Sequence, residues 1–308
     1  MEKIGETMAK LGQNTRVNSD QLIQTILADP EVASFISQHH LSQEQINLSL
    51  SKFNQFLVER QKYQLKDPSY IAKGYQPILA MNEGYADVSY LETKELVEAQ
   101  KQAAISERIQ LVSLPKSYRH IHLSDIDVNN ASRMEAFSAI LDFVEQYPSA
   151  EQKGLYLYGD MGIGKSYLLA AMAHELSEKK GVSTTLLHFP SFAIDVKNAI
   201  SNGSVKEEID AVKNVPVLIL DDIGAEQATS WVRDEVLQVI LQYRMLEELP
   251  TFFTSNYSFA DLERKWATIK GSDETWQAKR VMERVRYLAR EFHLEGANRR
   301  LEHHHHHH

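Results

Sequence analysis

Hydrophobic and polar positions follow one pattern in the first third of the chain and another in the rest. Over the first sixty residues, apolar side chains recur every three or four positions, which predicts amphipathic helices. Asp29 before Pro30 and the pair Ser42 and Gln45 have the spacing of helix starts. Apolar runs on both sides of "NEG" predict a β-hairpin. We therefore expect a smaller, mostly helical N-terminal domain with a β-hairpin over residues 1–105.

After this region, short apolar runs alternate with helical patterns. The runs "GLYLYG", "VSTTLLHF", "VPVLILDD" and "TFFTSN" predict strands, and amphipathic stretches such as "SYLLAAMAHELSEKK" lie between them. This alternation is typical of an α/β fold in which helices cover both faces of a parallel sheet. The preceding stretch "ELVEAQKQAAISERIQLVSL" is interpreted as a polar helix or linker. We therefore place the domain boundary within it and expect the second domain over residues 106–300.

The first of these strands leads into a phosphate-binding loop. "GDMGIGKS", residues 159–166, fits G-x-x-x-x-G-K-[ST] between a strand and a helix, the context that the pattern requires. The glycines let backbone N–H groups approach phosphates, Lys165 offers them a cation, and the Ser166 hydroxyl is a suitable Mg²⁺ ligand. We expect ATP to be bound by Gly159, Asp160, Met161, Gly162, Ile163, Gly164, Lys165, Ser166 and Tyr167.

Two later strands end in polar residues that belong at the same edge of the sheet. "VLILDDIGAE" places Asp221 and Asp222 after a buried strand, and open α/β sheets bind ligands at the carboxyl ends of their strands. We expect Asp221 to hold Mg²⁺ with Ser166, and Asp222 to orient or deprotonate the attacking water. "TFFTSN" brings Asn256 to the phosphate or the water. A solvated strand end and an ordinary turn are the alternatives.

Four arginines follow in "AKRVMERVRYLAREF", which is interpreted as about three turns of helix. They form either a solvated amphipathic face, or a functional set in which one arginine reaches the γ-phosphate of a neighbouring subunit and others contact single-stranded DNA. Nearby aromatic residues are possible stacking groups, although core packing explains them more simply. The arginines are Arg280, Arg284, Arg286 and Arg290, and the aromatic residues are Trp266, Trp276 and Tyr287.

Composition narrows the function classes. Of the 308 residues, 43% are hydrophobic and 24% charged, the net charge is −9, and cysteine is absent. The last eight residues, "LEHHHHHH" (301–308), are a purification tag that holds six of the thirteen histidines. Without cysteine there are no disulfides or thiolate metal sites, and no apolar run is long enough to span a membrane, so we expect a cytoplasmic protein. The acidic balance confines DNA contact to a local patch.

The series "GDMGIGKS", "VLILDDIGAE", "TFFTSN" and "KRVMERVRYLAREFHLEGANRR" resembles the AAA+ helicase loaders of the bacterial primosome, a family of DnaI, DnaC and IstB-related ATPases. The resemblance is strong over residues 115–300 and extends through "YQPILAMNEGYADVSYLET". It implies an ATP-dependent loader with weak or partner-stimulated ATPase activity. The C-terminal domain would bind single-stranded DNA, and the N-terminal domain would bind the hexameric replicative helicase.

The resemblance also implies roles for single residues. Asn256 matches the first sensor of the family, and Arg284 matches the trans arginine finger, with Arg280 as the second choice. A trans arginine needs a second subunit, which either self-association through the ATPase domain or a related protein would supply. DnaI relatives commonly carry a zinc site of cysteines and histidine in the N-terminal domain. Because this chain lacks the cysteines, we expect no zinc and a domain held by apolar packing alone.

Other functions are compatible with the sequence. An IstB-like helper of DNA transposition would use the same ATPase with a transposase as its partner. A P-loop small-molecule kinase would explain the loop and the acids but not the N-terminal region. A nucleotide-gated adaptor would bind ATP without hydrolysing it.

Overall fold

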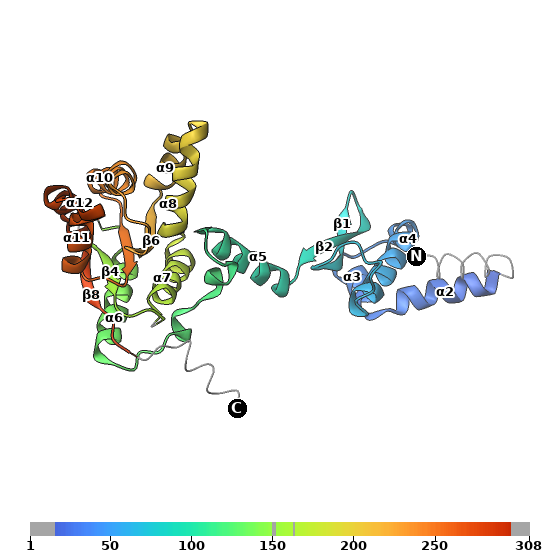
Figure 1. Ribbon diagram of the computed structural model, residues 1–308. Helices are drawn as coiled ribbons and strands as arrows, with labels where there is room; N and C mark the ends of the chain where they lie inside the picture. Colours follow the sequence, from blue (N-terminus) through green and yellow to red (C-terminus); the bar gives the residue numbers. More distant parts are fainter. Residues whose placement is uncertain (1–15, 150–151, 163, 297–308) are drawn as a thin grey trace, which may run out of the picture. The chain divides into compact units, whose positions relative to one another are not determined.

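The computed structural model describes residues 16–149, 152–162 and 164–296. These residues form two compact units, and the division falls between Gln102 and Ala103 (Figure 1). Each unit has a buried apolar core of its own. Within the described ranges, no helix is both long and apolar enough to cross a membrane.

The first unit is built from helices and one β-hairpin. Its helices begin where the sequence predicts: the Asp29 carboxylate accepts hydrogen bonds from two backbone N–H groups of the next helix, and Ser42 and Gln45 form a capping box. The hairpin turns at "NEG", which confirms that prediction as well. The elements are α2 (Arg16–Ala28), α3 (Pro30–Gln38), α4 (Gln43–Gln64), β1 (Tyr75–Asn82) and β2 (Tyr85–Glu92), followed by α5 (Lys94–Glu107).

An ion pair adds to the apolar packing of the first unit. Phe35 and Phe53 lie in the buried core between α3 and α4. Arg60 on α4 donates from Nη1 to Asp29 Oδ2 at 2.9 Å and from Nη2 to Asp29 Oδ1 at 2.7 Å. These bonds lower the pKa of Asp29. The expectation of apolar packing alone is therefore incomplete, because the pair fastens the start of α3 to α4.

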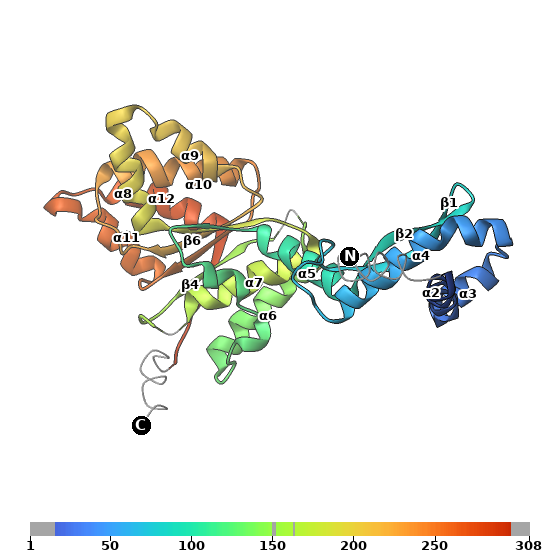
Figure 2. The ribbon, with the colours of Figure 1, turned by 90° about the vertical axis from the view of Figure 1, so that its right-hand side faces the viewer.

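A six-stranded parallel sheet forms the centre of the second unit (Figure 2). The strand order is β3-β5-β6-β7-β4-β8, and every neighbouring pair is parallel. The strands that precede the phosphate loop, the acids and Asn256 are β4, β6 and β7, so their carboxyl ends lie side by side. The strands are β3 (Ile109–Val112), β4 (Gly154–Tyr158), β5 (Thr184–His188), β6 (Val217–Ile223), β7 (Thr251–Ser255) and β8 (Ala289–His293).

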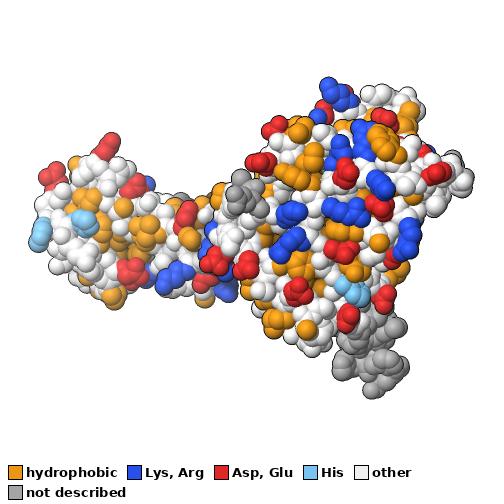
Figure 3. Space-filling model, turned by 90° about the vertical axis from the view of Figure 1, so that its left-hand side faces the viewer, with side chains coloured by type: hydrophobic (Ala, Val, Ile, Leu, Met, Phe, Trp, Pro, Cys, Tyr) orange, Lys and Arg blue, Asp and Glu red, His pale blue; other side chains and the backbone are white. Residues whose placement is uncertain are grey.

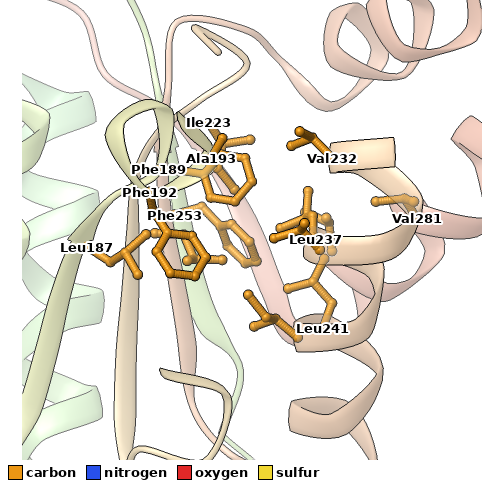
Figure 4. Packing of buried hydrophobic residues seen from close by; sticks show 14 of the residues in the cluster. Leu187, Phe189, Phe192, Ala193, Ile223, Val232, Leu237, Leu241, Phe253 and Val281 are labelled. Atoms are coloured by element: carbon orange, nitrogen blue, oxygen red, sulfur yellow. The ribbon is translucent and has the colours of Figure 1, made fainter. Parts of the chain in front are cut away.

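Helices cover both faces of the sheet, as predicted. Helices α6 (Ala131–Gln146) and α7 (Lys165–Lys180) pack on one face. The helices of the other face share a larger apolar cluster with the sheet, part of which Figure 4 shows. These helices are α8 (Phe189–Asn198), α9 (Val205–Lys213), the π-helix η4 (Val232–Leu237), α10 (Gln238–Leu246), α11 (Phe259–Ala267) and α12 (Thr275–Leu288). The second unit also contains the short 3-10 helices η1 (Lys116–His120), η2 (Leu123–Asp125), η3 (Ala199–Asn202) and η5 (Ile269–Gly271).

Several elements differ from the sequence-based prediction. Strand β3 lies in the stretch interpreted as a polar helix or linker, and Arg290 lies on strand β8 rather than on the arginine helix. Both are edge strands in which polar residues interrupt the apolar ones, so no continuous apolar run marks them. Helix α7 is buried around most of its surface and is not amphipathic. The prediction of core packing is confirmed for Trp266, which is buried. It is wrong for Trp276 and Tyr287, whose side chains are 68% and 52% exposed.

Arg244 on α10 is a buried guanidinium bound to neutral acceptors. It donates to Thr251 Oγ1 at 2.8 Å and to the carbonyl oxygens of Lys213 at 3.1 Å, Val215 at 2.7 Å and Pro250 at 2.7 Å. Burial lowers the pKa of Arg244. The four bonds tie α10 to the segments that enter β6 and β7, the two strands that end at the candidate site.

Candidate nucleotide-binding site

The loop between β4 and α7 has a backbone that only glycines adopt easily. Gly162 has a φ of 80° and Gly164 a φ of 91°, in the left-handed region that a Cβ disfavours. Gly164 is the N-cap of α7, so the loop ends at a helix N-terminus, where free N–H groups favour an anion. Ile163 lies outside the described residues. The described loop has the backbone form and the position of a phosphate-binding segment.

Lys165, the first residue of α7, crosses this loop. Its Nζ donates to the carbonyl oxygens of Gly159 at 2.7 Å and Asp160 at 2.9 Å, and to Asn256 Oδ1 at 3.1 Å. The residue is only 8% exposed, and burial lowers the pKa of Lys165. A phosphate beside this ammonium group would compensate for its lost hydration, so the surroundings suit an anionic ligand.

Ser166 and Asp221 meet although they are 55 residues apart. Ser166 Oγ donates to Asp221 Oδ1 at 2.5 Å, and Thr254 Oγ1 donates to the same oxygen at 2.7 Å. Asp221 is 6% exposed, so its carboxylate is held in one position from two sides. Hydroxyl and carboxylate oxygens are the ligands that Mg²⁺ prefers, and the pair therefore fits a magnesium ion that arrives with a nucleotide.

Asp222 has an unusual backbone conformation beside this pair. Its φ is 63°, and its N–H donates to Thr254 Oγ1 at 2.8 Å. Asp222 Oδ2 lies 3.7 Å from His188 Nε2, and His188 Nδ1 lies 2.7 Å from Ser191 Oγ. Left-handed residues other than glycine are uncommon and cluster at functional sites. His188 was not predicted from the sequence, because a histidine at the end of a strand carries no motif.

These side chains line one cavity of about 540 Å³, a volume typical of small-molecule sites. Leu114, Pro115, Tyr118 and Tyr167 line it together with the loop and the acids, and the two tyrosine rings lie 5.3 Å apart. Apolar and aromatic groups beside a phosphate-binding loop suit a nucleotide base. Tyr167 was expected from the sequence, whereas the lining residues Ser113, Leu114, Pro115 and Tyr118 carry no motif.

The loop after β6 is connected to the loop after β7. Gly224 has a φ of 95°, and a Cβ built on it would lie 2.7 Å from the ring of Tyr257. Lys265 Nζ donates to the Gly224 carbonyl oxygen and lies 4.7 Å from the centroid of the Tyr257 ring. Glu226 accepts from the Gly224 N–H at 2.7 Å, and burial raises the pKa of Glu226. The segments that follow the acids and Asn256 are therefore packed against each other.

The four arginines are not among the described residues that line the cavity. Arg284 Nε donates to Gln242 Oε1 at 2.6 Å, and Arg284 Nη1 donates to the carbonyl oxygen of Arg280 at 2.7 Å. Burial lowers the pKa of Arg284. Lysine and arginine side chains gather, with acidic and hydrophobic ones between them, on the face of the second unit formed by α11 and α12 (Figure 3). A trans role for Arg284 stays a prediction.

The strand order, the glycine-rich loop after β4 and the acids at the end of β6 define an ATP-binding P-loop protein of the AAA+ class. A family model described as IstB-like ATP binding protein matches residues 76–307. A second model, described as Primosomal protein DnaI N-terminus, matches residues 1–90. The chain belongs to the DnaI family of AAA+ helicase loaders, which is related to the IstB-like ATPases.

Individual relatives support this assignment. The replicative helicase loader DnaI of Bacillus subtilis (strain 168) is 35% identical over 292 residues, which cover 91% of this chain and 93% of that protein. A crystal structure from Streptococcus pyogenes serotype M3, solved as a candidate primosome component, is 90% identical and has a TM-score of 0.57 over 65% of this chain and 99% of that one. A crystal structure of DnaI is 42% identical, with a TM-score of 0.57 over 61% of this chain and 98% of that one.

Proposed function

We propose that this protein is an ATP-dependent loader of the replicative DNA helicase. The observation that carries the proposal is the meeting of Lys165, Ser166, Asp221 and Asn256 at one cavity, in a chain similar over 91% of its length to a helicase loader. Lys165 and the loop bind the phosphates, and Ser166 and Asp221 hold magnesium. The bound ion neutralises charge on the phosphates.

Hydrolysis depends in this proposal on three residues, two in the same chain and one from a neighbouring subunit. Asp222 lines the cavity, and its carboxylate accepts a hydrogen bond from the attacking water and orients it. Asn256 is held beside Lys165 Nζ, so its amide is available to the γ-phosphate or the water. Arg284 of a neighbouring subunit supplies positive charge to the γ-phosphate, which would keep activity low until subunits or partners assemble.

The first experiment compares helicase binding with ATP, with ADP and without nucleotide. Lys165→Ala should abolish nucleotide binding and remove the nucleotide dependence of co-sedimentation with the cognate replicative helicase. Lys180→Ala is the matched control, because Lys180 lies at the other end of α7 and donates to the exposed Glu145 carbonyl oxygen. Identical helicase binding in all nucleotide states of the unchanged protein would refute ATP-dependent loading.

A second experiment tests the trans role of Arg284. Arg284→Ala should lower ATP hydrolysis and leave ATP binding intact, because the residue lies outside the cavity of its own chain. A mixture of Arg284→Ala and Lys165→Ala proteins should recover part of the activity, since one subunit offers an intact site and its neighbour an intact arginine. Absence of recovery, with binding retained, would assign Arg284 a role within its own subunit.

Single-stranded DNA would bind the face formed by α12 and β8. Arg280 lies over the exposed Trp276 ring at 5.7 Å, and Arg290 lies over Phe292 at 5.3 Å. Cations beside aromatic rings are typical of single-strand binding surfaces. Trp276→Ala and Arg290→Gln should weaken binding of a labelled oligonucleotide in fluorescence anisotropy. Lys179→Gln is the control, because Lys179 is an exposed cation paired with Glu175 on α7, which packs on the other face of the sheet.

The N-terminal unit would bind the helicase. Chemical cross-linking of the full chain to the helicase, read by mass spectrometry, tests this directly, because the first unit carries several lysines of its own. Cross-links should come from Lys52, Lys62, Lys66 and Lys73. Cross-links confined to lysines of the second unit would contradict the assignment.

A transposition helper is the second candidate, because the IstB-like model matches residues 76–307. The match of residues 1–90 to the DnaI N-terminus favours the loader. Capture of a transposase, without the helicase, from cells that contain both would reverse this choice.

A further inference from the structure

Arg284 is held by two oxygen atoms of its own subunit. Its Nε donates to the side-chain Oε1 of Gln242 at 2.6 Å, and its Nη1 donates to the main-chain oxygen of Arg280, four residues earlier, at 2.7 Å. Gln242 lies on α10 and Arg284 on α12, so the first bond joins two helices through residues 42 positions apart in sequence. The direction of the Arg284 side chain is therefore set within the single subunit.

Gln242 belongs to a helix that is itself fixed in place. Helices α10 and α12 share the larger apolar cluster of the second unit, in which Leu241 and Val281 lie (Figure 4). Arg244, further along α10, binds this helix to the segments that enter β6 and β7. A side chain is oriented best when its hydrogen-bond partner stands on a rigid element. Gln242 meets this condition for Arg284.

The two acceptors leave the charge of Arg284 uncancelled. Both are neutral oxygens, one of an amide and one of the main chain. Burial and the neighbouring Arg280 lower the pKa of Arg284, but a guanidinium remains protonated in proteins. A carboxylate at position 242 would accept the same hydrogen bond and would also pair with the cation. An amide orients the guanidinium and leaves its positive charge available to a phosphate.

Part of the guanidinium remains available for a ligand from outside. Arg284 is half-buried, and its Nη2 makes no hydrogen bond with any residue that the structure describes. Gln242 and Arg280, which hold the other two nitrogens, line a cavity of about 600 Å³ between α10 and α12. An arginine anchored through Nε and Nη1 can offer Nη2 to an anion of a neighbouring molecule.

We propose that Gln242 is a positioning residue for the ATPase reaction, because it holds Arg284 in the orientation that reaches the γ-phosphate bound by a neighbouring subunit. This inference rests on the trans role proposed above for Arg284. It assigns a function to a residue of α10 that carries no motif. It also predicts that a change at Gln242 affects hydrolysis at the neighbour's site and not at the site of its own chain.

The experiment adds Gln242→Glu to one member of the mixture of Lys165→Ala and Arg284→Ala proteins. In the Lys165→Ala protein, which supplies the arginine, the new carboxylate should pair with Arg284 and lower the recovered ATP hydrolysis roughly tenfold. In the Arg284→Ala protein, which supplies the nucleotide site, it should leave the recovered rate and the KM for ATP unchanged. Gln277→Glu in the Lys165→Ala protein is the matched control, because Gln277 lines the same cavity about two helical turns from Arg284.

A second variant separates orientation from folding. Gln242→Leu removes the acceptor, so in the Lys165→Ala protein it should also lower the recovered rate. Gln242→Glu retains an acceptor, so its melting temperature should match that of the parent protein even though its activity falls. A structural role alone would leave Gln242→Glu fully active, because the hydrogen bond to Arg284 is kept.

The outcomes separate this inference from the proposed trans arginine. Loss of activity only when Gln242→Glu accompanies Lys165→Ala supports the positioning role. Full activity in that mixture, or equal loss in both arrangements, overturns the positioning role and leaves the trans role of Arg284 standing. If the mixture without any change at Gln242 recovers no activity, the trans role is wrong and this inference is wrong with it.

Discussion

Replacement of Gly224 by alanine is the sharpest test of how the loops after β6 and β7 are packed. The residue has a φ of 95°, which disfavours any side chain, and the new Cβ would lie 2.7 Å from Tyr257 Cδ2 and 3.0 Å from Leu262 Cδ1. Left-handed strain costs about 1–2 kcal/mol. Overpacking of a filled core costs about 1–3 kcal/mol more. Gly224→Ala should therefore lower the free energy of unfolding by about 2–5 kcal/mol.

Gly203→Ala isolates the packing contribution. Gly203 has a φ of 72°, but nothing lies within 4 Å of its added Cβ, so only the backbone strain applies. The free energy of unfolding of Gly203→Ala should therefore be higher than that of Gly224→Ala by about 1–3 kcal/mol. ATP hydrolysis should fall further in Gly224→Ala, because a displaced Tyr257 would move the adjoining Asn256.

Urea unfolding followed by tryptophan fluorescence gives the required free energies. Trp231, Trp266 and Trp276 are the three tryptophans of the chain, and all lie in the second unit, so unfolding of the first unit does not enter the signal. Equal destabilisation by the two alanine variants would refute the reasoning. It would mean that the loop after β6 can move away from Tyr257 without a decrease in the free energy of unfolding.

Three other predictions follow from contacts described above. Arg244→Met should lower the free energy of unfolding of the second unit by about 3 kcal/mol or more in the same urea assay, because buried acceptors lose their donor; an unchanged midpoint would contradict this. Folding lowers the pKa of Asp29 below its unfolded value of 3.8. The ionised carboxylate should therefore stabilise the first unit at pH values above 3.8, and this contribution should be lost as the pH falls through the pKa of Asp29 in the folded protein. Acid unfolding followed by amide NMR signals of α3 should show this pH dependence, and Asp29→Asn should remove it, whereas Arg60→Ala should reduce it. His188→Ala should lower kcat roughly tenfold, or about 1.4 kcal/mol, by freeing the Asp222 carboxylate, while a fluorescent ATP analogue still binds; an unchanged kcat would exclude this role.

The spacing of apolar residues and the residues that begin helices were sufficient to predict most of the fold. The buried strands β4 to β7 are runs of apolar and β-branched residues. Helix starts such as Asp29 and Ser42 use local hydrogen bonds that the neighbouring residues specify. The edge strands β3 and β8 could not be identified in this way. Each pairs on one side only and mixes polar with apolar residues, so tertiary pairing rather than local pattern decides its conformation.

The candidate site was predictable where a motif fixes the chemistry. The phosphate loop, Asp221 and Asn256 follow from residue type and from the rule that parallel strands end together. His188 and Lys265 were missed because histidine and lysine are common at strand ends and helix surfaces, and only the folded chain brings them beside Asp222 and Gly224. Their contacts are long-range in sequence and leave no local pattern.

The direct passage from α12 into β8 has a mechanical consequence. Strand β8 pairs with β4 from Ala289 opposite Gly154 to His293 opposite Tyr158, and the last two rings stack 4.7 Å apart. Tyr158 immediately precedes Gly159. A partner that pulls on α12 would therefore also pull on β8 and, through the β8–β4 hydrogen bonds, on the phosphate loop that follows β4. Force would reach a bound nucleotide along the backbone without rearrangement of the apolar core.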